Sequence, residues 1–227
     1  MKKVICIAAL VLVMGCLFAL ELSNSTFIGG VSFDYITANG HDFKSVEHGG
    51  NKPFTTTVAG LSVYGGYDVR VGSRWFTRLE YEILILPTRF DFVDEDIDKD
   101  AGVKRSGSKK RFGGYVTLGK DSQIKVNLGG VVTNITMGIS GDYTGGTFEH
   151  VQNTYGLGLI LEGQYNLGNH FTLRFGIVPD FTFVTIDRLD ISYRDADLSV
   201  DNDSTYRTTL FDFGFSISAR MGVSYKF

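Results

Sequence analysis

Residues 210–227 read LFDFGFSISARMGVSYKF, an alternation of apolar and polar side chains that continues to the last residue. The apolar side chains occupy every second position, and the positions between them are polar or small. The apolar set is Phe211, Phe213, Phe215, Ile217, Ala219, Met221, Val223, Tyr225 and Phe227. Because successive side chains of a β-strand point to opposite faces, the segment predicts a strand with one apolar and one polar face.

The apolar face of this strand predicts contact with lipid. An exposed stripe with this many aromatic side chains would drive aggregation in water. Strands of about ten residues with apolar side chains outside and polar ones inside are typical of membrane β-barrels.

The start of the chain predicts export. Met1, Lys2 and Lys3 form a short basic start, and residues 4–20 are uncharged and mostly apolar. This pattern predicts a secretory signal peptide at residues 1–20 and a mature chain at residues 21–227. An uncleaved membrane helix and lipid attachment at Cys16 are the alternatives, because residues 13–16 loosely resemble a lipoprotein box. The apolar run continues past Cys16 to Leu20, which argues against lipid attachment at Cys16.

Composition indicates one β domain. The signal holds both cysteines, Cys6 and Cys16, so no disulfide is expected in the mature chain. It also holds two of the 22 basic residues and none of the 25 acidic ones, which leaves 20 against 25 and a net charge of −5. This modest acidity excludes a nucleic-acid partner. Twenty-eight glycines, 18 Phe and 11 Tyr against three prolines favour strands and turns over helices.

The same alternation recurs along the mature chain and predicts eight strands. They are expected at residues 25–38, 56–69, 74–86, 110–119, 123–137, 153–167, 170–186 and 210–227. An even number lets the first and last strands pair, so the sheet closes and no backbone group stays unpaired in lipid. The expected fold is therefore all-β, a closed antiparallel eight-stranded transmembrane β-barrel.

The connections carry a second pattern. Links at 70–73, 120–122 and 168–169 are short, whereas those at 39–55, 87–109, 138–152 and 187–205 are long. Short turns at one end and long loops at the other are typical of outer-membrane barrels, with the turns periplasmic. We therefore expect a protein of the outer membrane of a diderm bacterium, with four long loops facing the cell exterior.

These features together resemble the small outer-membrane barrels of the OmpW, OmpX and opacity-protein type. The resemblance covers the mature chain and includes the C-terminal Tyr225-Lys226-Phe227. It implies that the last strand, with Tyr225 and Phe227, is read by the barrel-assembly machinery, and that outer-membrane lipids surround the barrel. It is specific for architecture and weak for activity.

Charged side chains are expected inside the barrel near the short turns. The alternation directs a cluster of six inward: Arg78, Glu80, Glu82, Glu162, Arg174 and Arg220. Isolated charges are costly in a narrow lumen, so we expect them to pair across it. Such pairing would plug and stabilise the barrel, and an ion-conducting role is the alternative.

The same register predicts an apolar lumen nearer the long loops. Its residues would be Ile36, Val58, Leu84, Leu86, Ile135, Met137, Ile160, Val178, Val184 and Ile186. The arrangement resembles that of OmpW and suggests a recess that binds or passes a small hydrophobic molecule. Pro179, which cannot donate a hydrogen bond to a neighbouring strand, would weaken the wall and provide a lateral exit. The alternative is a packed core, and a bulge at a glycine pair such as Gly129-Gly130 would reverse part of the assignment.

The loops predict no enzyme, cofactor or metal site. His41, His48, His150 and His170 have no serine or carboxylate at catalytic spacing. The acidic run at 94–100 departs from a calcium loop, because Gly102 falls one position late and Gly107 stands where Glu is required. We expect this run to pair with the basic residues at 104–111 in the same loop. Four polar loops would suit an alternative function, a surface-displayed or adhesin barrel that contacts host or environmental molecules.

Overall fold

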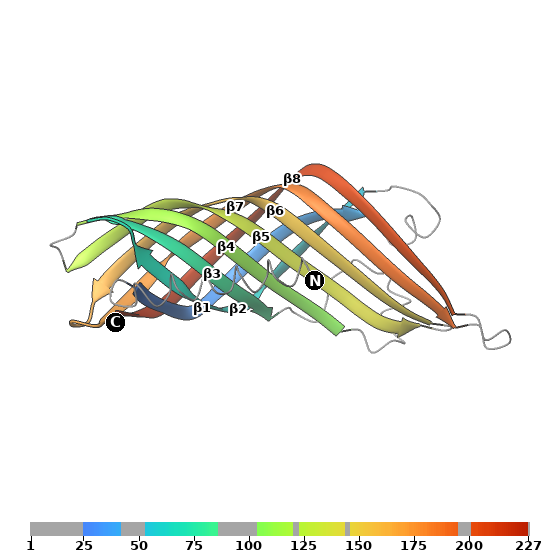
Figure 1. The fold of residues 1–227 in the computed structure, drawn as a ribbon, viewed down its shortest axis with the longest axis horizontal. Coiled ribbons are helices and arrows are strands. Elements are labelled where there is room, and N and C mark those ends of the chain that lie inside the picture. Colours follow the sequence, from blue (N-terminus) through green and yellow to red (C-terminus); the bar gives the residue numbers. More distant parts are fainter. Residues whose placement is uncertain are drawn as a thin grey trace, which may run out of the picture.

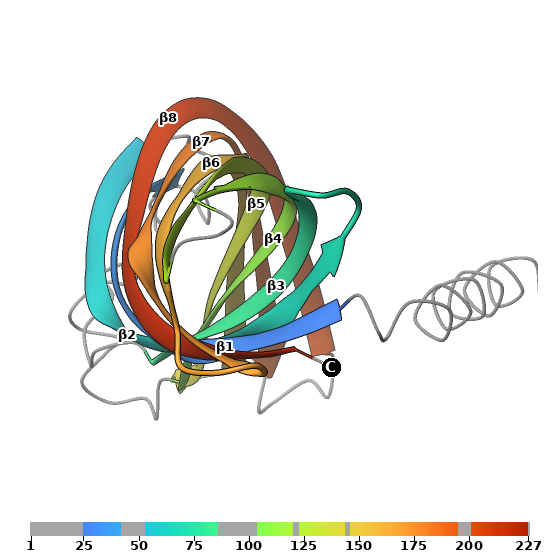
Figure 2. The ribbon, with the colours of Figure 1, turned by 90° about the vertical axis from the view of Figure 1, so that its left-hand side faces the viewer.

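The computed structural model describes residues 25–41, 53–85, 104–119, 123–143, 146–194 and 201–226. Eight strands form one closed antiparallel barrel in the order of the chain (Figures 1 and 2). They are β1 (Ser25–His41), β2 (Pro53–Arg70), β3 (Trp75–Ile85), β4 (Lys104–Leu118), β5 (Ile124–Tyr143), β6 (Gly146–Asn166), β7 (Phe171–Arg194) and β8 (Asp201–Lys226). The predicted fold class is confirmed. Among the described residues, no helix is long and apolar enough to cross a membrane.

Several predicted features lie outside the described residues. They are the signal peptide at 1–20 with Cys16, the lumen residue Leu86, His48, the acidic run at 94–100 and Phe227.

Pairing of the first and last strands closes the barrel. Partners run from Thr26 opposite Lys226 to Thr37 opposite Phe215. Each strand therefore has a neighbour on both sides over its membrane-spanning part, which allows its backbone groups to pair without water except where the β6–β7 ladder is interrupted.

The two faces of the sheet have the polarity of a membrane barrel. On β3, Leu79 and Ile83 are 44% and 54% exposed, whereas Arg78, Glu80 and Glu82 are at most 2% exposed. Apolar side chains thus cover the outside and ionised ones fill the inside, which is the reverse of a water-soluble protein.

Three short connections lie at one end of the barrel. Residues 71–74 join β2 to β3, and residues 167–170 join β6 to β7. The link from β4 to β5 begins at Gly119, whose φ of 72° is a left-handed conformation that glycine adopts without steric cost. This end, marked by the C-terminus in Figure 1, is called the short-turn end below.

The strands reach farther at the opposite end than the sequence pattern predicts. The expected loop at 138–152 is largely strand, because β5 and β6 pair as far as Tyr143 opposite Gly146. Likewise β7 and β8 pair up to Arg194 opposite Asp201, within the expected loop at 187–205. The prediction failed because polar side chains occupy the outward positions here, for example Ser140, so the apolar-outward pattern is lost.

A bulge in β7 corrects two predicted lumen residues. The register shifts between Thr182 and Val184, and beyond it Val184 and Ile186 lie opposite the outward-facing Tyr155 and Asn153. One extra residue moves all later side chains to the other face, so Val184 and Ile186 do not line the lumen. The register runs without a shift past Gly129 and Gly130, so no bulge occurs there.

Candidate functional site in the barrel lumen

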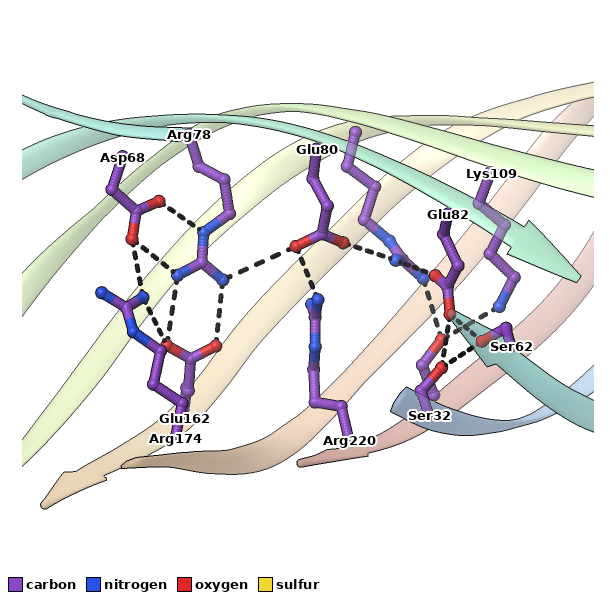
Figure 3. A network of polar contacts seen from close by, with 12 residues as sticks. Ser32, Ser62, Asp68, Arg78, Glu80, Glu82, Lys109, Glu162, Arg174 and Arg220 are labelled. Carbon is purple, nitrogen blue, oxygen red and sulfur yellow. Dashed lines mark hydrogen bonds and ion pairs between the residues drawn. The ribbon is translucent and has the colours of Figure 1, made fainter. Parts of the chain in front are cut away.

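Two arginines and two carboxylates form the charged layer nearest the short turns, here called the lower layer. Arg78 donates to both oxygens of Asp68, at 2.8 and 3.1 Å, and to both oxygens of Glu162, at 3.0 and 3.1 Å. Arg174 donates from Nη1 to Asp68 at 2.6 Å and to Glu162 at 3.0 Å (Figure 3). The four side chains come from β2, β3, β6 and β7, so they tie different walls of the barrel together.

A middle layer lies next to it, centred on Glu80. Arg220 donates to Glu80 at 2.6 Å (Figure 3). Arg111 donates to Glu80 at 2.9 Å and to Glu82 at 2.6 Å. Arg111 also donates from Nη2 to Asp180 Oδ2 at 2.8 Å. Glu80 lies 3.9 Å from Arg78, which joins the two layers.

An upper layer pairs Lys109 with Asp34. Their ion pair is surrounded by serine hydroxyls: Lys109 Nζ donates to Ser216 and Ser218 at 2.9 Å, and Ser62 donates to Asp34 at 2.5 Å. Ser62 also donates to Glu82, which links this layer to the middle one.

The three layers close the lumen. They contain six carboxylates and five cations, all at most 5% exposed. The charges are nearly balanced and hydrogen-bond to one another. These interactions offset much of the desolvation free energy of the buried side chains. Because the side chains are buried against one another, the described part of the chain leaves no open aqueous path at this level.

All six predicted charged residues lie in these layers, but the sequence pattern missed two of the central cations. Lys109 and Arg111 were expected in a loop that pairs with the acidic run, and instead they lie on β4 and are at most 2% exposed. The inward alternation of Lys109, Arg111, Gly113 and Tyr115 was the available signal. It was obscured because the outward positions between them include the charged Lys110.

Aromatic rings fill the space beside the charges. Tyr115 stacks on Phe76 with centroids 5.1 Å apart, carries Arg78 over its face at 4.9 Å and donates to Asp68 at 2.6 Å. Tyr64 carries Arg220 over its ring at 3.9 Å. These rings replace water around the guanidinium groups and restrict their movement.

The predicted apolar lumen residues point inward but are packed. Seven are at most 6% exposed: Ile36, Val58, Leu84, Ile135, Met137, Ile160 and Val178. Neither of the two cavities at the ends of the barrel is lined by any of them. Ile160 belongs to a cluster with Tyr115 and Val131, beside the charged layers and away from the long-strand end.

The lumen toward the long-strand end is mixed rather than apolar. Buried polar side chains alternate with the apolar ones, and the hydroxyl oxygens of Thr154 and Thr185 are 3.4 Å apart. His150, expected in a loop, lies on β6 with Nε2 3.7 Å from Asp187. Asp187 points inward only because of the bulge in β7, so sequence alternation could not place it.

Pro179 lies where the β6–β7 ladder is interrupted. Pairing runs to Gly158 opposite Asp180 and resumes at Leu161 opposite Ile177. Val178 and Pro179 therefore stand outside the ladder on this side, as expected for a residue without an amide hydrogen. On the other side Pro179 remains opposite Ile217 of β8.

A cavity of about 910 Å³ lies against the far ends of β4 to β8. Its lining is mainly polar and charged and includes Lys104, Glu149, Arg188, Asp190 and Arg207. Arg188 is 2.6 Å from Asp190 and 3.7 Å from Glu149.

Comparison with known proteins supports the fold. No protein-family model matches the chain, and no curated protein sequence is similar to it. The chain is similar in structure to Neisserial surface protein A, with a TM-score of 0.50, 13% identity, and coverage of 89% of this chain and 97% of that one. It is also similar to a major outer membrane protein of Thermus thermophilus, with a TM-score of 0.50, 14% identity, and coverage of 89% and 99%.

These likenesses concern architecture. Together with the closed ring, the apolar exterior and the ionised interior, they confirm the resemblance inferred from the sequence at the level of the fold. The chain has the fold of the small outer-membrane β-barrels.

Proposed function

We propose that this chain is a closed, non-conducting outer-membrane barrel that acts through the projecting sheet it presents outside the cell. The projecting sheet consists of residues 139–143 of β5, 146–153 of β6, 187–194 of β7 and 201–211 of β8. Its partner is a protein that contributes an extended segment. The observation that carries this proposal is the length of β5 to β8.

These four strands have 20, 21, 24 and 26 residues, whereas β3 has 11. A membrane strand needs about 9–11 residues, so roughly half of each of the four strands is more than the membrane requires. In Figure 1 they extend farther than the other strands at the end opposite the C-terminus.

The polarity of the projecting sheet suits water. Its outward side chains include Ser140, Glu149 and Arg188, in contrast to the exposed Leu157 and Leu159 nearer the middle of β6. The change from leucine to charged and hydroxyl side chains within one strand supports a membrane boundary near Asn153.

The edge of β8 offers a site for strand addition. β8 pairs with β1 only up to Phe215, so among the described residues 201–211 have a partner strand on the β7 side alone. Phe211 at this edge is 83% exposed. An unpaired edge with an exposed aromatic residue favours binding of an extended segment through backbone hydrogen bonds.

We expect two substitutions to separate this surface from the barrel. Phe211→Lys places a charge on the free edge and should reduce adhesion of proteoliposomes to a panel of immobilised extracellular proteins by at least about tenfold for the protein that binds. Val71→Lys is the matched control, because Val71 is 65% exposed at the short-turn end. It should leave adhesion unchanged.

A deletion and a conductance measurement complete the test. Asp187 lies opposite Thr208, so replacing residues 188–207 with Asn-Gly should close a shorter hairpin without changing the barrel. This variant should fold and lose adhesion, and the wild type should give no conductance steps in planar bilayers. Steady ion conductance, or adhesion that survives the deletion, would contradict the proposal.

Uptake of a small hydrophobic molecule is a second candidate, favoured by the interrupted ladder at Pro179. Because the apolar side chains are packed, the ligand would have to displace them. We expect an aliphatic fluorescent probe retained by the wild type to be lost when Leu84 and Ile135 are both replaced by Asp, and its release to slow in Pro179→Ala. Equal retention by all three proteins would refute this candidate.

A further inference from the structure

A second cavity, of about 260 Å³, occupies the mouth of the lumen at the short-turn end. Its floor is formed by the stacked rings of Phe76 and Tyr115 and by Arg174 of the lower layer. Its wall and rim carry hydroxyl and amide groups from several strands and turns: Thr26, Ser73, Thr117, Gln164, Asn166, Asn169, Thr172 and Ser224.

Every ionised side chain that lines this cavity is a cation. They are Arg70, Arg74, Lys125, Arg174 and Lys226, and no Asp or Glu is among the lining residues. This one-sided charge differs from the balanced layers deeper in the lumen. Since the closed walls exclude water on most sides, like charges gathered here create a strong positive potential.

Most of these cations form no ion pair with another described residue. Arg174 is offset by Asp68 and Glu162 in the lower layer. Arg70 donates to the turn carbonyls of Gly72 and Ser73, at 2.9 and 3.2 Å. Within the described part of the chain, no carboxylate lies within ion-pair distance of the other three, Arg74, Lys125 and Lys226.

Arg174 supplies a buried donor for which the described residues offer no acceptor. The residue is 4% exposed, and its Nε has no hydrogen-bond partner. Its Nη1 serves both carboxylates of the lower layer, and in Figure 3 the outer end of the guanidinium points away from the network. A buried donor without an acceptor is costly, so the hydrogen-bonding capacity of this guanidinium is not exhausted by the lower layer.

We propose that the short-turn mouth binds a phosphate group. The site combines guanidinium and ammonium cations with neutral hydroxyl and amide donors, the mixture that satisfies several oxygens of one phosphate. The group can come from a free phosphate compound or from the headgroup of a phospholipid at the rim. In either case Lys125 and Arg74 hold it above Arg174. This site is independent of the projecting sheet at the other end of the barrel.

The test uses the full-length folded protein in a zwitterionic detergent, with inorganic phosphate as the probe. Calorimetric titration at constant ionic strength should give saturable binding that sulfate displaces and chloride does not. The double variant Arg74→Gln/Lys125→Gln should weaken binding by at least about tenfold. Neither residue belongs to the charged layers, so the variant should fold normally.

The matched control removes one arginine and one lysine elsewhere. Arg207→Gln/Lys110→Gln changes the net charge equally at exposed positions far from the mouth, and it should change the affinity less than about twofold. If both double variants weakened phosphate binding equally, the proposal would be overturned, because the affinity would then depend only on the net charge of the protein.

A lipid arm distinguishes the two sources. The wild type and Arg74→Gln/Lys125→Gln are reconstituted in nanodiscs with and without an anionic phospholipid, and retained lipid is measured by native mass spectrometry. If the wild type retains the anionic phospholipid and the double variant does not, the site binds a lipid headgroup, even if free phosphate fails to bind. No saturable phosphate binding together with equal lipid retention would refute the site.

Discussion

Arg78→Gln is expected to lower the free energy of unfolding in detergent by about 3–5 kcal/mol, because it breaks a buried ion-pair network by removing one partner. Arg78 makes four hydrogen bonds to Asp68 and Glu162, and the three side chains are at most 2% exposed. Without it, Arg174 is the remaining ion-pair partner of both desolvated carboxylates among the described residues. Denaturant titration followed by tryptophan fluorescence of Trp75, the single tryptophan, measures the change.

Two controls make this prediction specific. Arg188→Gln removes the same chemical group from an ion pair with Asp190 whose arginine is 42% exposed, and its effect should stay below about 1 kcal/mol. Adding Glu162→Gln to Arg78→Gln removes one of the stranded carboxylates and should recover part of the loss. If Arg78→Gln and Arg188→Gln were equally stable, the lower layer would not stabilise the barrel.

The sequence predicted the barrel wherever side chains alternate between lipid and lumen. β3 is the clearest element, because the outward Leu79 and Ile83 flank the inward Glu80 and Glu82, as the pattern requires. Lipid outside and charge pairing inside impose opposite demands on successive residues, and this contrast is readable without any structure. The inward direction of all six predicted charged residues follows from it.

The same reasoning failed where the surroundings change. In the projecting sheet the outward positions carry polar side chains, so strand residues such as Ser140 and Glu149 were read as loop. The bulge after Thr182 reverses which side chains point inward, which moved Val184 and Ile186 out of the lumen and brought Asp187 into it. Period-two alternation alone reveals neither a β-bulge nor a change in the medium that surrounds the strand.

The partners of the buried charges were also beyond the sequence. Arg111 binds Glu80 and Glu82 on the neighbouring β3, where Glu80 lies directly opposite it, whereas closure of the barrel brings Asp180 of β7, 69 residues away along the chain, across the lumen to the same guanidinium. The shear of the strands decides which inward residues share a level. The predicted division into a charged lower half and an apolar upper half ignored this stagger, and Ile160 accordingly lies beside the charges.

The seam between β1 and β8 depends on a pair of glycines. Gly30 lies directly opposite Gly222, and the ring of Tyr64 covers both from the lumen side, with Arg220 stacked on the same ring. A Cβ atom at Gly222 would overlap with the Tyr64 hydroxyl and with the backbone oxygen of Gly29. Movement of the tyrosine would disturb Arg220, which lies over its ring and donates to Glu80, and movement of the backbone oxygen would disturb the ladder between the two strands that close the barrel.

Gly222→Ala is therefore expected to cost about 3 kcal/mol, at the upper end of the range for overpacking, although it adds a single methyl group. Gly65→Ala is the matched control, because the nearest atom to a Cβ there is the backbone oxygen of Ile28 at 3.9 Å. Removing a glycine from a strand without a clash should stabilise the barrel by about 0.5–1 kcal/mol, so the two substitutions should have opposite signs. Denaturant titrations of both variants, with the fraction folded read from the mobility shift between boiled and unboiled samples in SDS electrophoresis, measure this contrast. Similar stabilities for the two variants would show that the seam tolerates a side chain and that Tyr64 does not fix its spacing.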